Sequence, residues 1–135
     1  MKMETKWAYL IQDGMQIMYM GEMLTPSYFI GGVSKEEHRY QHWKDGAELI
    51  CKLTKSGLFY LDGTTSPAED LSWFYAELRN NDPFGSGAGV WMAQELGLTS
   101  RGRGLLERYK VHLSKEDFDL AFIEEIESAF EECGG

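Results

Sequence analysis

The chain has 135 residues, of which 43% are hydrophobic and 13% aromatic, and its formal net charge is −9. These values fit one domain over residues 1–135 that can bury one core. No apolar run approaches the roughly 18 residues that would span a bilayer, so no membrane partner is expected. Net acidity argues against free nucleic acid as the main partner, because binding phosphates requires a basic surface.

The first residues and the two cysteines indicate a cytoplasmic protein. Residues 1–6 lead into a stretch typical of a strand and not into the apolar segment of a signal peptide. Cys51 and Cys133 are too few for a disulfide framework. Cys51 lies in an apolar, strand-like pattern, which predicts a buried and unreactive thiol.

The N-terminal half of the chain is predicted to be rich in strands. Its strand-like runs cover residues 6–12, 15–20, 28–30, 47–52 and 58–61. Asp13 and Gly14 separate the first two runs, and this dipeptide is among the strongest hairpin signals. The last two runs flank a turn at 55–57, which predicts a second hairpin. Before that hairpin, a Ser-x-x-Glu capping pattern predicts a short helix over 34–43.

The C-terminal half is predicted to be helical. A capping pattern over 66–69 begins a helix whose apolar stripe runs from Leu71 to Leu78. The other predicted helices cover residues 90–96, 100–110 and 115–133. Because strands precede helices, the order favours an α+β fold. We expect a small antiparallel sheet of about four to five strands from the N-terminal half, packed against about three or four helices mostly from the C-terminal half.

The predicted helix from Lys115 to Cys133 carries most of the negative charge. Residues 114–135 contain eight acidic residues and one basic residue, whereas residues 1–113 contain 14 acidic and 12 basic residues. Like charges four residues apart destabilise an isolated helix, and acids at its end oppose the helix dipole. Local stability therefore does not explain this arrangement. The candidate partner-binding residues on this helix are Asp119, Glu124, Glu127 and Glu131.

Two interpretations of the acidic helix remain open. It is either a docking face for a basic protein or a solvated surface that serves solubility alone. The first interpretation makes the chain a small protein–protein interaction module, of the kind found among inhibitors, immunity proteins, antitoxins and phage-encoded proteins. A locally basic segment precedes the helix, and folding against the helix would shrink the exposed acidic face. The basic residues of that segment are Arg101, Arg103, Arg108 and Lys110.

A methionine-rich stretch raises the question of self-association. Met15, Met18, Met20 and Met23 fall close together in the sequence. Two interpretations are open: these residues form the face of a homodimer, or they fill irregular gaps in the core, for which methionine is well suited.

His38 and His42 suggest an alternative function in metal or small-molecule binding. Their spacing of four residues places both imidazoles on one face of the predicted helix over 34–43, a geometry that zinc sites use. Arg39 stands where the zinc-protease pattern requires glutamate, so that motif is not met. The other interpretation is an incidental pair of histidines, and no motif in the chain requires a cofactor.

Residues 93–108 suggest a second alternative, which is nucleic-acid binding through a degenerate helix-turn-helix. Residues 93–99 look like the first helix and turn of that motif, and Arg101, Arg103 and Arg108 would lie on the recognition helix. Two glycines weaken this second helix, and the acidic helix that follows would repel phosphate. Both features weigh against nucleic acid as a partner.

The glycine-rich loop over 85–89 raises the question of a catalytic or phosphate-binding element. It precedes a helix, but it lacks the Lys-Ser/Thr pair of a P-loop. Ser86 does not fit the Gly-x-Ser-x-Gly pattern of an activated nucleophile. The sequence therefore leaves an enzymatic function open without favouring it.

Overall fold

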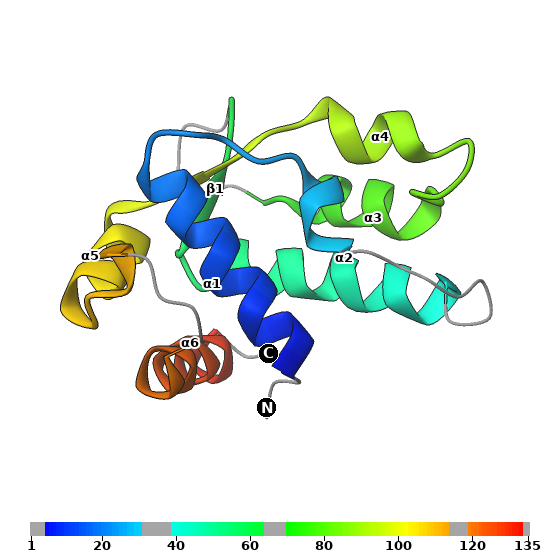
Figure 1. Ribbon diagram of the computed structural model, residues 1–135. Coiled ribbons are helices and arrows are strands. Elements are labelled where there is room, and N and C mark those ends of the chain that lie inside the picture. Colours follow the sequence, from blue (N-terminus) through cyan, green and yellow to red (C-terminus); the bar gives the residue numbers. More distant parts are fainter. Residues whose placement is uncertain (1–4, 31–38, 64–69, 114–118, 134–135) are drawn as a thin grey trace.

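The computed structural model describes residues 5–30, 39–63, 70–113 and 119–133, and this part of the chain is mostly helical (Figure 1). Its α-helices are α1 (Thr5–Tyr19), α2 (Arg39–Lys55), α3 (Ser72–Asn80), α4 (Ala88–Ala93), α5 (Ser100–Arg108) and α6 (Leu120–Glu132). Its 3-10 helices are η1 (Pro26–Ile30) and η3 (Val111–Leu113), and its strands are β1 (Phe59–Leu61) and β2 (Leu96–Leu98).

The predicted sheet of four to five strands is wrong. The first predicted hairpin is the single helix α1, and the run over 47–52 lies inside α2. The run over 58–61 does contain a strand, β1, but its partner is the distant β2, with Tyr60 opposite Gly97 in an antiparallel pair. A short apolar run fits a buried helix as well as a strand, so periodicity alone did not separate the two.

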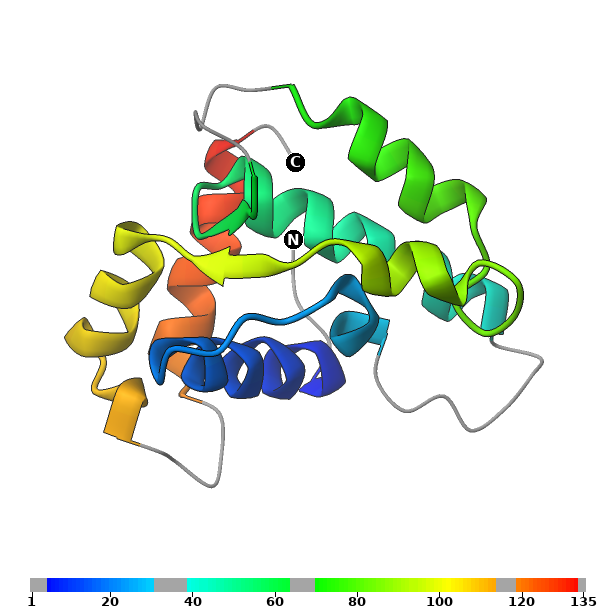
Figure 2. The ribbon, with the colours of Figure 1, turned by 90° about the horizontal axis from the view of Figure 1, so that it is seen from above.

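Gly14 lies inside α1, at a point where two aromatic rings approach the helix backbone closely. A Cβ atom added to Gly14 would lie 3.1 Å from ring carbons of Tyr28 and of Phe29, both in η1. A Cβ atom added to Gly46 of α2 would lie 3.2 Å from the Phe29 carbonyl oxygen. Two helical glycines therefore let η1 approach both helices closely, as Figure 2 shows. The Asp-Gly pair marks this close packing and not a turn.

Replacing Gly14 or Gly104 with alanine is expected to change stability in opposite directions. Alanine is favoured over glycine inside a helix by roughly 0.5–1 kcal/mol. Nothing lies within 4 Å of a Cβ atom added to Gly104 of α5, so Gly104→Ala should raise the free energy of unfolding. Gly14→Ala should lower it by about 1–2 kcal/mol, because the rings of Tyr28 and Phe29 must move. Chemical denaturation measures both changes, and an equal gain at the two positions would contradict the close packing of η1.

Strand β2 lies at the centre of the sheet region. One of its edges pairs with β1. On the other edge Leu96 exchanges two backbone hydrogen bonds with Leu24, at 2.7 and 3.1 Å. This pairing also explains why α4 is shorter than the helix predicted over 90–96, since the chain from Leu96 onwards is extended.

The core takes buried side chains from all six α-helices and from both strands. In Figures 1 and 2, α2, α3 and α4 lie together at one end of the molecule, whereas α5 and α6 lie at the other end. Met15 and Met18 are buried, as the core-filling interpretation predicts, but Met20 is 77% exposed. The largest fully buried side chains include Trp91, Phe29, Phe59, Phe74, Phe122 and Phe130.

The helices predicted in the second half of the chain are largely confirmed. Helix α3 contains the predicted apolar stripe except Leu71, which precedes it, and α5 forms within 100–110 in spite of its glycines. The Thr99 side chain caps α5 by accepting the Gly102 N–H at 3.1 Å. Helix α6 covers the predicted acidic helix from Leu120 onwards. The predicted helix starts at 34–37, 66–69 and 114–118 lie outside the described residues.

Candidate functional site

The acidic helix α6 is fixed to α1 at its first turn. The Asp119 backbone N–H donates to Gln12 Oε1 at 2.7 Å, and the Asp119 carboxylate accepts the Phe122 N–H at 3.0 Å. Gln12 is itself buried. A side-chain cap of this kind satisfies a backbone donor that the start of a helix leaves unpaired. Asp119, predicted as a partner-binding residue, therefore has a capping role.

The other predicted partner-binding residues lie along one outward line of α6. Helical spacing places this line opposite the side that buries Phe122 and Ile126. The carboxylates of Glu124 and Glu131 are exposed and that of Glu127 is half-buried. Leu120, on the same line, is 63% exposed. Sequence reasoning missed that leucine, although its spacing from the acids is helical. We call this line the acidic stripe, and its residues are Leu120, Glu124, Glu127 and Glu131.

The basic segment of α5 folds against a different face of α6. Arg108 pairs with Glu125 at 3.5 Å, and Arg101 pairs with Glu132 at 3.4 Å. Arg101 also donates to the Ser56 carbonyl at 2.6 Å. Figure 1 shows α5 beside α6. Exposed pairs of this kind contribute about 0–1 kcal/mol each, so they orient α5 more than they stabilise it. Folding thus divides the acids of α6 between a flank that faces α5 and the outward stripe.

The predicted helix-turn-helix over 93–108 is not formed. Helix α4 ends before the proposed turn, and residues 96–98 form β2 instead of continuing a helix. The guanidinium of Arg103 lies over the Tyr19 ring, 4.5 Å from its centroid. The other two arginines assigned to the recognition helix make the ion pairs with α6. All three are held by groups of the protein itself.

The two histidines considered as metal ligands are not placed by the structure. His38 lies outside the described residues, and His42 belongs to α2 but its side chain lies outside the described part. Among the side chains that are described, no group of three or more His, Cys, Asp and Glu residues could hold a metal ion. Metal binding by His38 and His42 stays a prediction.

The glycine-rich loop over 85–89 packs against its own chain. A Cβ atom added to Gly87 would lie 2.5 Å from the backbone of Asn81 and of Asp82. The Trp91 side chain, fully buried in α4, donates from Nε1 to the Asn81 carbonyl at 2.7 Å. Close backbone packing therefore explains the glycine at position 87 of this loop.

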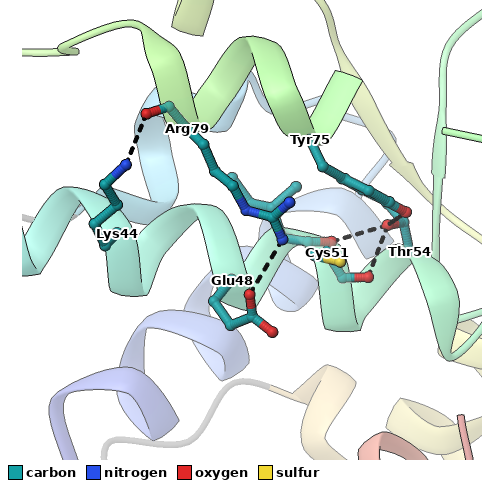
Figure 3. Close-up of polar contacts among 7 residues, drawn as sticks. Lys44, Glu48, Cys51, Thr54, Tyr75 and Arg79 are labelled. Carbon is teal, nitrogen blue, oxygen red and sulfur yellow. Dashed lines mark hydrogen bonds and ion pairs between the residues drawn. The ribbon is translucent and has the colours of Figure 1, made fainter. Parts of the chain in front are cut away.

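Cys51 is buried, as predicted, but it lies on helix α2 and faces α3 instead of belonging to a strand (Figure 3). Burial is the main cause that raises the pKa of its thiol. The hydroxyls of Thr54 and Tyr75 are 2.6 Å apart, and Thr54 Oγ1 donates towards the Cys51 carbonyl at 3.0 Å. Burial likewise raises the pKa of Tyr75. A thiol with a raised pKa stays protonated and is a poor nucleophile, which agrees with the predicted unreactive role.

The exposed end of the contact between α2 and α3 is polar (Figure 3). Lys44 Nζ donates to the Arg79 carbonyl at 2.9 Å, and the Arg79 guanidinium pairs with Glu48 at 3.3 Å. Trp43 adds a hydrogen bond from Nε1 to the Leu78 carbonyl at 2.7 Å. These groups join α2 to α3, so we interpret the cluster as a helix–helix contact and not as a catalytic site.

No protein-family model matches the chain, and comparisons with curated proteins and with solved structures give no significant match. Of the helices in the described residues, none combines the length and apolar character needed to cross a bilayer.

Proposed function

We propose that this protein is a cytoplasmic interaction module that binds a basic protein partner through the acidic stripe of α6. The observation that carries the proposal is the division of charge on this helix. Residues 119–133 contain six acids and no base. Asp119 caps the helix, while Glu125 and Glu132 pair with arginines of α5. The acidic stripe holds the other three acids, and a hydrogen bond from the N-terminal amino group, together with its charge, lowers the pKa of the Glu131 carboxyl.

The stripe has the chemistry that a salt-dependent protein interface uses. Aligned carboxylates attract a basic surface from a distance and accelerate encounter, and salt screens this attraction. The exposed Leu120 supplies an apolar contact within the charged area, since it is 63% exposed. Within the helix itself, like charges three or four residues apart repel by a few tenths of a kcal/mol per pair, roughly. A basic partner would relieve this repulsion.

Reversing the charge of the stripe is expected to weaken the complex by at least about 30-fold, which corresponds to roughly 2 kcal/mol. The test variant carries Glu124→Lys, Glu127→Lys and Glu131→Lys. The control carries Glu22→Lys, Glu77→Lys and Glu95→Lys, which change the net charge equally at exposed positions elsewhere. The control should weaken binding by less than about threefold, because distant exposed charges are screened.

The partner for this measurement is identified by cross-linking in the native cell, with a photo-reactive amino acid placed at one position of the chain. Ser128 is exposed on α6 next to the stripe, and Ala76 is exposed on α3 and serves as the reference position. We expect a basic protein to cross-link from Ser128 and not from Ala76, and the purified pair to dissociate as salt rises. Equal binding by the two triple variants, or binding that salt does not affect, would show that the proposal is wrong.

A further inference from the structure

A groove of about 310 Å³ lies between α1, η1 and η3. One side of α1 forms its longest wall, because Asp13, Gln16 and Ile17 follow helical spacing and Met20 comes directly after the helix. The groove is separate from the acidic stripe, and we call it the α1 groove. It is lined by Asp13, Gln16, Ile17, Met20, Tyr28 and His112.

The donors of two lining side chains are already used inside the protein. Gln16 Nε2 donates to the Val111 carbonyl at 2.8 Å. His112 Nδ1 lies 3.3 Å from the Leu106 carbonyl, so in the neutral ring the proton on Nδ1 points to that oxygen. Gln16 Oε1 and His112 Nε2 are then left as hydrogen-bond acceptors. The polar groups that these residues can offer to a ligand are acceptors.

A single carboxylate gives the groove its charge. Asp13 is exposed on α1, and none of the ion pairs in the described part of the chain uses it. Burial and the charge of Asp13 together raise the pKa of the Tyr28 hydroxyl, so the field of the carboxylate reaches the opposite wall. Ile17 of α1 and the exposed Met20, directly after the helix, add an apolar surface.

We propose that the α1 groove binds an organic cation, an ammonium or guanidinium group on an aliphatic stem. Asp13 balances the charge, Gln16 and His112 accept its N–H groups, and the apolar wall contacts the stem. A guanidinium of the protein itself lies over an aromatic ring nearby, since the Tyr19 ring is 5.2 Å from the His112 ring of the groove. Arg103 lies 4.5 Å from the centroid of the Tyr19 ring, whose hydroxyl donates to Glu107. An aromatic face beside a carboxylate suits this group well.

Titration of the full chain with small ligands tests the proposal. NMR spectroscopy monitors the backbone amide signals of the lining residues during the titration. The probes are butylguanidine and an arginine blocked at both ends, and the neutral control is blocked citrulline, which has the same length. We expect saturable shifts at Gln16, Ile17 and Tyr28 with a Kd of about 1 mM or tighter, which is typical of a small ligand. Citrulline should bind at least about tenfold more weakly, because it lacks the charge.

Asp13→Asn should weaken the binding of both cations by at least about tenfold, whereas Asp62→Asn, at another exposed aspartate, should leave it unchanged. Binding of butylguanidine alone identifies a free organic cation as the ligand. Binding of blocked arginine as well identifies a side chain of a protein. Shifts that never saturate, or equal binding by the two variants, would overturn the proposal. The charge-reversed stripe variant should still bind these probes, so the two proposals can fail independently.

Discussion

Replacing Phe29 with alanine is expected to lower the free energy of unfolding by about 3–5 kcal/mol. The ring is fully buried, and its centroid lies 5.5 Å from that of Phe59 and 5.2 Å from that of Tyr28. The same residue approaches Gly14 of α1 with its ring and Gly46 of α2 with its carbonyl. Because helices lie on both sides of the ring, they can close only part of the cavity that alanine would leave. The loss of stability therefore includes the cost of this cavity as well as the lost burial of the ring.

Guanidinium denaturation of Phe29→Ala measures this loss. Phe29→Leu fills much of the same volume and should cost about 1–2 kcal/mol. Trp73→Ala is the control, because this aromatic side chain is 50% exposed. Its removal should change stability by less than about 1 kcal/mol. A loss below about 1 kcal/mol for Phe29→Ala would contradict the packing of η1 between the two helices.

Replacing Trp91 with alanine is expected to cost a similar amount, about 3–5 kcal/mol. Trp91 is fully buried in the short helix α4, and its Nε1 donates to the Asn81 carbonyl at 2.7 Å. Trp91→Phe keeps a buried ring but leaves that carbonyl without its donor. It should therefore lose about 1–3 kcal/mol.

The two Trp91 variants are compared with Met92→Ala in the same denaturation experiment. Met92 is the next residue of α4 and is 62% exposed, so its change should stay within about 0.5 kcal/mol. If Trp91→Phe were as stable as the parent protein, the hydrogen bond to Asn81 would make no net contribution. If Trp91→Ala and Met92→Ala were equally stable, α4 would not be held by this side chain.

The sequence predicted the helices of the second half because their signals are local. The stripe from Leu71 to Leu78 has helical spacing, and all of it except Leu71, the residue just before the helix, lies in α3. The outward acids of α6 could also be placed from spacing, because buried and exposed positions alternate regularly along an amphipathic helix. Asp119 could be placed on that helix in the same way, but its capping role follows only from knowing that α6 begins at Leu120.

The first half was predicted wrongly because its signals depend on distant residues. Asp13-Gly14 is a typical turn pair, but here the glycine makes room for rings that come from Tyr28 and Phe29. Strand β1 pairs with residues 96–98 and not with its neighbour in the chain, and no local pattern contains that information. The α1 groove likewise joins three separate elements, so it had no sequence signal of its own.

The central position of β2 has a consequence for the folding rate of the protein. Its two edges meet Leu24 and Tyr60, which lie far away along the chain, so both contacts require large loops to close. The helices satisfy their hydrogen bonds locally and can form on the microsecond timescale, roughly. Chains that depend on distant pairings fold more slowly than those with local contacts. A strand of three residues is thus expected to set the folding rate of this mostly helical protein.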